Sequence, residues 1–167
     1  MTKPTPSTTP KHIYLYADPS RLEMIDISEK PFVYREAVAE GEISLRRETV
    51  ERIKEKKVKK GDAIEVAKVA ALQAVKSTPE IIPFCHPIKI TSVEVSHRLH
   101  ERSIGFTVKV KALEQTGVEM EALTGLSVAL LTVWDMVKAY EKDEEGNYPE
   151  TGIKDIRVKY KVKRPRP

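Results

Sequence analysis

Two long segments of alternating apolar and polar residues constrain this chain more than any other feature. They span residues 88–99 (IKITSVEVSHRL) and 103–113 (SIGFTVKVKAL), and only residues 100–102 separate them. Alternation with a period of two is typical of β-strands that bury one face. Because the link between the segments is so short, the pattern predicts an antiparallel hairpin within an antiparallel sheet.

Helical patterns lie on both sides of the predicted hairpin. Residues 63–77 are rich in Ala and Val and follow Asp62, whose carboxylate can accept hydrogen bonds from free backbone N–H groups. We expect this helix to be buried nearly all round and to end at Pro79. Residues 116–119 (TGVE) fit a capping box, and the helix after them reaches about Tyr140. Its predicted core stripe consists of Leu123, Leu126, Leu130, Val133 and Val137.

Three further segments carry strand patterns. Residues 22–27 (LEMIDI) alternate, and residues 32–45 predict a strand with a bend at Gly41. Residues 153–162 (IKDIRVKYKV) predict a last strand, whereas residues 48–60 predict a short helix followed by a loop. The resulting order resembles βαββαβ with leading strands. The economical arrangement is an α+β fold, in which helices pack on one face of an antiparallel sheet.

The length of 167 residues favours a single domain. We expect a disordered, Thr- and Pro-rich leader over residues 1–11, one domain over residues 12–162 and a basic tail over residues 163–167. A short apolar and aromatic stretch, residues 12–16, ends at the turn signal Asp18-Pro19.

The composition, 40% hydrophobic and 32% charged, is that of a globular chain. No run of about 18 apolar residues is present, so we expect no transmembrane helix, and residues 1–10 lack the apolar core of a secretory signal. The single cysteine, Cys85, excludes an internal disulfide and a multi-cysteine metal site. These features together favour the cytoplasm. A net charge of +4 suits an anionic partner without singling out nucleic acid.

Metal-ligand patterns are weak. His97 and His100 are three positions apart on a strand, so their side chains point to opposite faces, and no HExxH or CxxC motif is present. We expect no metal site. The simplest interpretation of Cys85 is a small buried residue. His86, held between Pro83 and Pro87, could act as an acid or a base, could donate a hydrogen bond to phosphate, or could make a structural hydrogen bond.

Charged residues on the long helix offer acid–base chemistry. Asp135 and Lys138, three positions apart, form either an ordinary surface ion pair or an acid–base couple in a poorly solvated pocket. Glu119 belongs to the predicted capping box, and Glu121 suits the first turn of a helix. Lys76 would be costly if buried. Lys, Arg and His side chains converging on one cleft would bind a polyphosphate without a glycine-rich loop.

Five segments together resemble a known family. They are MIDISEKP, YREAVAEGEI, KKGDAIEVAKVAALQAVKSTPEIIPFCHPI, TGVEMEALTGLSVALLTVWDMVKAYEKD and IKDIRV. With these motifs the chain resembles the cyclic pyranopterin monophosphate synthase family, the accessory protein C family of molybdenum cofactor biosynthesis. The resemblance extends over about residues 22–161, nearly the whole chain.

The resemblance implies a phosphorus–oxygen lyase with a ferredoxin-like fold. Its substrate is a cyclised dihydroguanosine triphosphate, made from GTP by a radical enzyme, and its products are cyclic pyranopterin monophosphate and pyrophosphate. The family assembles as a hexamer of three dimers, with active sites where two subunits meet. No resident cofactor is implied, and the residues do not decide whether Mg²⁺ accompanies the triphosphate.

The motifs also imply site residues. Asp135 in WDMVK is the catalytic aspartate, Lys138 is its partner, and Lys60 in KKGD is the matching lysine. Substrate-pocket residues are Phe84, Cys85, His86, Met120 and Glu121, and supporting members are Arg35, Lys76, Glu119 and Lys161. Two features depart from the family: the tail lacks a glycine-rich GGKSG-like segment, and the loop at residues 143–150 is longer than usual.

Two other classes of function are alternatives. Ferredoxin-like folds also serve as RNA-recognition modules, whose strand aromatics stack bases, but the hairpin here offers only Phe106. A non-catalytic scaffold that assembles through the apolar helix is the second alternative. Such a scaffold would tolerate the loss of His86 and Asp135, whereas an enzyme would not.

Overall fold

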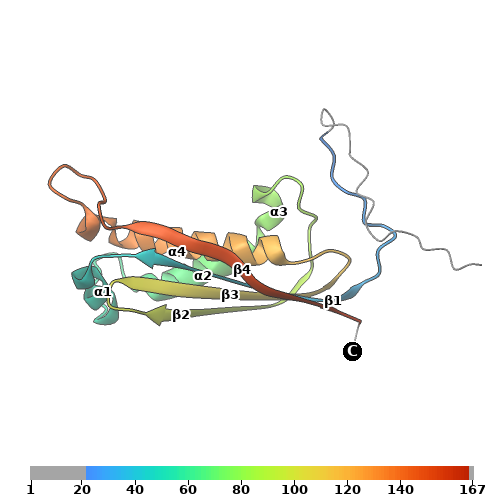
Figure 1. Ribbon diagram of the computed structural model, residues 1–167, viewed down its shortest axis with the longest axis horizontal. Helices are drawn as coiled ribbons and strands as arrows, with labels where there is room; N and C mark the ends of the chain where they lie inside the picture. The colour runs from blue at the N-terminus through green and yellow to red at the C-terminus, as the bar shows by residue number, and fades with distance from the viewer. Residues whose placement is uncertain (1–21, 166–167) are drawn as a thin grey trace, which may run out of the picture.

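The computed structural model describes residues 22–165 (Figure 1). The expected leader, the stretch at residues 12–16 and the last two residues of the expected tail lie outside the described residues. The elements are β1 (Val33–Ser44), α1 (Arg47–Lys54), α2 (Ala63–Lys76), α3 (Thr78–Ile81), β2 (Ile90–Leu99), β3 (Ser103–Glu114), α4 (Glu119–Glu141) and β4 (Gly152–Arg164).

The four strands form one antiparallel sheet in the order β2-β3-β1-β4. The predicted hairpin is confirmed: β2 pairs with β3, and Val95 lies opposite Val108. Figure 1 shows α2 and α4 running along one face of the sheet, with α1 at one end and α3 at the other. This is the ferredoxin-like α+β arrangement, so the expected fold class is confirmed. The fold therefore has an α1 end and an α3 end, at opposite ends of the long helices.

The core lies between the sheet and the two long helices. Alternate residues of β1 and β3 point into it, including Ala37, Ala39, Phe106 and Val108, because strand side chains alternate between faces. Helices α2 and α4 approach closely at Gly125, where an added Cβ would lie only 2.6 Å from a methyl group of Val75. Small residues thus permit this contact between the helices.

The opposite face of the sheet carries charged side chains in a regular pattern. Glu36, Glu40 and Glu42 follow one another along β1, and their partners on β3 and β4 are basic. These pairs are Glu36 with Lys109, Glu40 with Arg157 and Lys159, and Glu42 with Lys154. Cross-strand pairs of opposite charge stabilise the sheet modestly and keep this face polar.

Two predicted elements at the start of the chain have different outcomes. The strand with a bend is confirmed as β1, whose register with β4 shifts between Val38 and Ala39 and again across Gly41. The strand predicted at residues 22–27 is wrong, because this segment has no regular structure. The edge strands of the described sheet are β2 and β4, and residues 22–27 pair with neither of them. Alternation alone therefore does not make a strand.

The helix predictions are right in extent and wrong in detail. Asp62 caps α2, accepting from the N–H groups of Ile64 and Glu65 at 3.2 Å each. However, α2 is not buried nearly all round, because Val66, Val69 and Leu72 are exposed on the side away from the core. Helix α4 and the sheet cover only part of the surface of α2, so Ala- and Val-rich composition does not ensure burial on every side.

The predicted capping box is also wrong, and the last strand is longer than predicted. Helix α4 begins at Glu119 after Val118, with no side-chain cap. The carboxylate of Glu119 instead accepts a hydrogen bond from Lys161 of β4. Strand β4 runs on to Arg164, so the first residues of the expected basic tail belong to the sheet, where Arg164 pairs with Tyr34.

Helix α4 is the central helix of the core. Its length and mean hydropathy of 1.4 would suffice to cross a membrane, but 56% of that apolar stretch is buried inside the protein. Leu126, Leu130, Val133 and Val137 from the predicted stripe are fully buried, and Leu123 is partly buried. The apolar character of α4 is thus explained by packing against the sheet.

Candidate functional site

Asp135 lies between two lysines at the C-terminal end of α4. The Nζ of Lys138 is 2.8 Å from Oδ1 of Asp135, and the Nζ of Lys60 is 2.7 Å from Oδ2. Lys60 also donates to the main-chain carbonyl of Asp135 at 2.8 Å. One carboxylate and two ammonium groups leave this cluster with a net positive charge, which suits an anionic substrate.

The loop between α1 and α2 brings Lys60 to this cluster. Val58 anchors the loop because its side chain is buried in the core. Gly61 follows Lys60 at a φ of 111°, a backbone conformation that side-chain-bearing residues rarely adopt. The turn at Gly61 then leads directly to the cap of α2 at Asp62. The lysine is therefore presented on a well-anchored loop.

The two lysines lower the pKa of the Asp135 carboxyl to about 2, with the hydrogen bond from Lys138 as the largest cause and that from Lys60 as the next. The same contact raises the pKa of Lys138. Asp135 is thus a carboxylate and Lys138 an ammonium at neutral pH. Both side chains are about half exposed, so the poorly solvated setting considered from the sequence is absent within the described chain.

A second group of predicted site residues lines a hollow at the other end of α4. The hollow has a volume of about 370 Å³ and lies between the loop before β2 and the first turn of α4. Its lining includes all five predicted pocket residues, Phe84, Cys85, His86, Met120 and Glu121, together with Glu119. Phe84 is 51% exposed at its rim. Proline on each side of this loop restricts its backbone.

Glu121 contributes a buried carboxyl group to this hollow. Its side chain is only 1% exposed, and its Oε2 has no hydrogen-bond partner among the described residues. Burial raises the pKa of Glu121 to about 7. Burial, followed by the nearby Glu121, also raises the pKa of the Cys85 thiol. An unpartnered buried carboxyl oxygen is costly, so this atom is well suited to meet a polar group of a ligand.

Two more predicted residues, Lys161 and Arg35, border the same end. Lys161 of β4 lies 2.7 Å from Oε1 of Glu119. Burial by itself would raise the pKa of Glu119, but the Lys161 hydrogen bond helps to lower it overall. Arg35 donates to the carbonyls of Glu114 and Gln115 at 3.3 Å and 2.9 Å and so holds the start of the β3–α4 connection.

The two groups do not meet within one chain. Asp135 follows Glu121 by 14 helical positions, which corresponds to about 21 Å along the axis of α4. The structure thus places Lys60, Asp135 and Lys138 at one end and the pocket residues at the other. Lys76 joins neither group, because it is exposed and borders a separate hollow beside β2.

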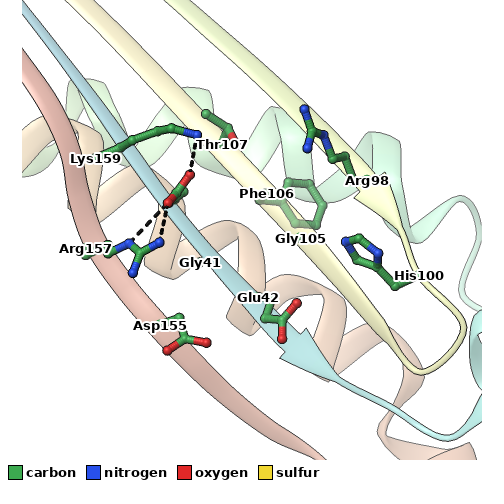
Figure 2. A pocket seen from close by; sticks show the side chains of 11 residues that line it. Gly41, Glu42, Arg98, His100, Gly105, Phe106, Thr107, Asp155, Arg157 and Lys159 are labelled. Atoms are coloured by element: carbon green, nitrogen blue, oxygen red, sulfur yellow. Dashed lines mark hydrogen bonds and ion pairs between the residues drawn. The ribbon is translucent and has the colours of Figure 1, made fainter.

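The polar face of the sheet contains a further hollow of about 280 Å³ (Figure 2). Three of its lining residues form ion pairs, because Arg157 and Lys159 lie 2.7 Å and 2.8 Å from the carboxylate of Glu40. Phe106, the one aromatic residue of the hairpin, is 1% exposed and packs in the core. It is therefore unable to stack on a base, and the RNA-recognition alternative loses the residue it depended on.

Sequence reasoning missed several contributors. Thr116 and Gly117 line the hollow beside Glu121, and an added Cβ at Gly117 would collide with the carboxylate of Glu119. The TGVE motif that contains them predicts a helix cap, so the pattern gives no sign that they line a hollow. Within residues 22–165, no group of three or more His, Cys, Asp or Glu side chains is arranged to hold a metal ion.

Fold and site together define an α+β protein that presents lysines around a carboxylate and, separately, a hollow with a buried glutamate. The family model described as the MoaC family matches residues 24–163. The chain belongs to the MoaC family, as its motifs indicated.

Relatives of known name agree with this assignment. A protein of Sulfurisphaera tokodaii is 58% identical over 141 residues, which are 84% of this chain and 93% of that protein. A protein of Thermococcus kodakarensis is 53% identical over 148 residues, 89% of this chain and 95% of that protein. A protein of Methanosarcina acetivorans is 53% identical over 150 residues, 90% and 95% respectively. All three are named probable cyclic pyranopterin monophosphate synthases.

Proposed function

We propose that this chain is a cyclic pyranopterin monophosphate synthase of molybdenum cofactor biosynthesis. It converts the cyclised dihydroguanosine triphosphate into cyclic pyranopterin monophosphate and releases pyrophosphate. The observation that carries the proposal is the contact of Lys60 and Lys138 with the two oxygens of Asp135. The names of the relatives support the same reaction.

The lysine cluster suits the phosphate chemistry. A sugar hydroxyl attacks the innermost phosphorus, a new P–O bond forms, and the P–O bond to pyrophosphate breaks. The carboxylate of Asp135 is ionised at neutral pH and so can accept the hydroxyl proton. Lys60 and Lys138 hold the charge that develops on the phosphate oxygens and the leaving group. As these ammonium groups turn toward phosphate, the carboxylate becomes more basic, because it loses the contacts that lower its pKa.

The hollow at the other end suits the base of the substrate. A guanine-derived ring presents N–H groups along one edge, and the unpartnered Oε2 of Glu121 is a buried acceptor for such a group. His86 and Cys85 lie on the facing loop, and Met120 contributes apolar surface. Lys161, Glu119 and Arg35 then form the charged border of the base-binding end.

A complete site requires a second copy of the chain. Val66, Val69 and Leu72 of α2 are 43%, 58% and 38% exposed, and Leu131 of α4 is 56% exposed, so the helix layer presents apolar surface outward. Such surface is typical of an interface between proteins. If two copies pair with their α4 helices antiparallel, the Asp135 end of each meets the Glu121 end of the other. Two-fold symmetry then creates two identical composite sites.

The remaining parts of the proposal rest on the family resemblance and on composition. Three such dimers form a hexamer, and the single cysteine is consistent with a reduced, cytoplasmic setting. Lys76, which is exposed on α2, is assigned to the substrate site only through the partner copy. The proposal includes no resident cofactor.

The test is direct incubation of the purified protein with the cyclised intermediate, followed by detection of the cyclic pterin phosphate and of pyrophosphate. Equimolar formation of both products is expected. Intermediate left unchanged by the folded, oligomeric protein would overturn the proposal. Parallel reactions with EDTA and with added Mg²⁺ decide whether the metal accompanies the triphosphate.

A further inference from the structure

Tyr140 ties the Lys60 loop to α4 at a point outside the charged cluster. Its hydroxyl oxygen accepts a hydrogen bond from the main-chain N–H of Lys59 at 2.9 Å. Lys59 directly precedes Lys60, whose ammonium contacts Asp135. The loop is therefore attached to α4 twice, through Lys60 at Asp135 and through Lys59 at Tyr140. These attachment points are five helical positions apart, or about 7.5 Å along the axis.

The tyrosine ring is itself held in place. The guanidinium carbon of Arg52 in α1 lies 5.1 Å from the centre of the ring, a cation–π arrangement. The carbonyl of Arg52 accepts the N–H of Lys57 at 2.8 Å, so the same residue also fixes the start of the loop. The ring of Tyr140 packs against the core from its partly buried position. The hydroxyl is thus a fixed acceptor rather than a mobile surface group.

We propose that Tyr140 is a positioning residue, which holds the Lys59 main chain so that the Lys60 ammonium stays on Asp135. The side chain of Lys60 has four rotatable carbon–carbon bonds and is about half exposed, so its own ion pair holds it only weakly. A fixed main chain immediately before it restricts where the ammonium can reach. Small displacements of a charged group at a reaction centre lower turnover strongly. The inference rests on the proposed function where it concerns turnover, but the attachment of the loop is testable without it.

The variant Tyr140→Phe removes the acceptor and keeps the ring beneath Arg52. Tyr34→Phe is the matched control, because the Tyr34 hydroxyl also makes one short hydrogen bond, 2.6 Å to Glu36, on the polar face of the sheet. Hydrogen exchange of the Lys59 amide, followed by NMR in the intact oligomer, is expected to become at least about tenfold faster in Tyr140→Phe. It is expected to stay unchanged in Tyr34→Phe. Equal exchange in Tyr140→Phe and the wild type would overturn the proposal.

Turnover gives a second, separate readout. In Tyr140→Phe we expect kcat to fall about tenfold with little change in KM, because ground-state binding of the substrate is shared with the other end of the site. In a Lys60→Ala background, adding Tyr140→Phe should cause no further loss, since the group that it positions is gone. An additive loss, or an unchanged kcat despite faster exchange, would overturn the positioning role. A wild-type protein that fails to convert the intermediate refutes the proposed function instead, while the exchange rate still decides the attachment.

Discussion

The Lys60 ammonium lies 2.7 Å from Oδ2 of Asp135, although 75 positions separate the two residues in the chain. Lys138 holds the other oxygen of the same carboxylate at 2.8 Å. Two cations on one carboxylate are more than charge neutrality requires. The cluster therefore carries an excess positive charge, and its two ammonium groups are available to bind the phosphate oxygens of a triphosphate.

The first prediction concerns the carboxylate. Asp135→Asn should lower kcat by a factor of about 10² to 10⁴, because an amide is unable to accept the hydroxyl proton. The side chain is 57% exposed, so the melting temperature and the far-ultraviolet circular dichroism should change little. Glu94→Gln is the control, since Glu94 is a similarly exposed carboxylate paired with Lys111 at 3.1 Å. Full turnover by Asp135→Asn would remove this carboxylate from the mechanism.

The second prediction concerns the lysines. Lys60→Ala and Lys138→Ala should each lower kcat/KM by a factor of about 10² to 10³, as expected when a group that stabilises developing charge is lost. The matched control is Lys154→Ala, because Lys154 is equally exposed and bonded to Glu42 at 2.9 Å on the other face of the sheet. Steady-state kinetics with the cyclised intermediate checks this. A loss of the same size in Lys154→Ala would show that the effect is not specific to the site.

The third prediction concerns pH and stability. The pKa of Glu121 is raised to about 7 from an ordinary value of 4.5, so between these pH values the folded state keeps a proton that the unfolded chain releases. Stability therefore falls as pH rises through this window. Glu121→Gln removes the effect. The free energy of unfolding of Glu121→Gln minus that of the wild type should therefore increase by up to about 3 kcal/mol as the pH is raised from about 4 to about 8.

Urea unfolding at fixed protein concentration measures this difference. Glu119→Gln serves as a control of opposite sign, because the pKa of Glu119 is lowered in the folded state. The stabilisation by Glu119 is present above the ordinary glutamate pKa and is lost as pH falls through its lowered value. Glu119→Gln should therefore be less stable than the wild type at about pH 8. A pH-independent difference for Glu121→Gln would contradict the raised pKa that burial gives its carboxyl.

The fourth prediction concerns the composite site. Asp135→Asn damages one end of α4, and His86→Ala damages the loop at the other end. If each site uses one end from each copy, a mixed dimer of the two variants contains one site with both defects and one intact site. Random re-assembly of equal amounts should then restore about a quarter of the wild-type activity. Mixtures that stay inactive after verified subunit exchange would mean that no site is shared in this way.

Local patterns predicted much of the fold, because each pattern reports on neighbours within one element. The alternation in residues 88–99 and 103–113 corresponds to β2 and β3, and the apolar steps of residues 123–137 correspond to the central helix α4. The failures have a common cause. The segment at residues 22–27 alternates but does not pair with an edge strand of the sheet. Glu119 has the spacing for a capping box, but its carboxylate instead accepts a hydrogen bond from Lys161, 42 positions away. In both cases a long-range partner, or its absence, decided the outcome.

The contacts of the candidate site are likewise of two kinds, those predicted by local spacing and those that depend on distant segments. The contact between Asp135 and Lys138 follows from their three-residue spacing, because helix geometry alone places such side chains together. That Lys60 joins them, and that Tyr140 holds the preceding residue, depends on how the α1–α2 loop folds back onto α4.

The hairpin strands, the length of α4 and the family motifs were predictable from the amino-acid sequence alone, since these are properties of short stretches of chain. The separation of the lysine cluster from the hollow around Glu121, at opposite ends of α4, became visible in the folded chain. The reason is physical: which distant segments meet depends on how whole faces of helices and sheet pack together.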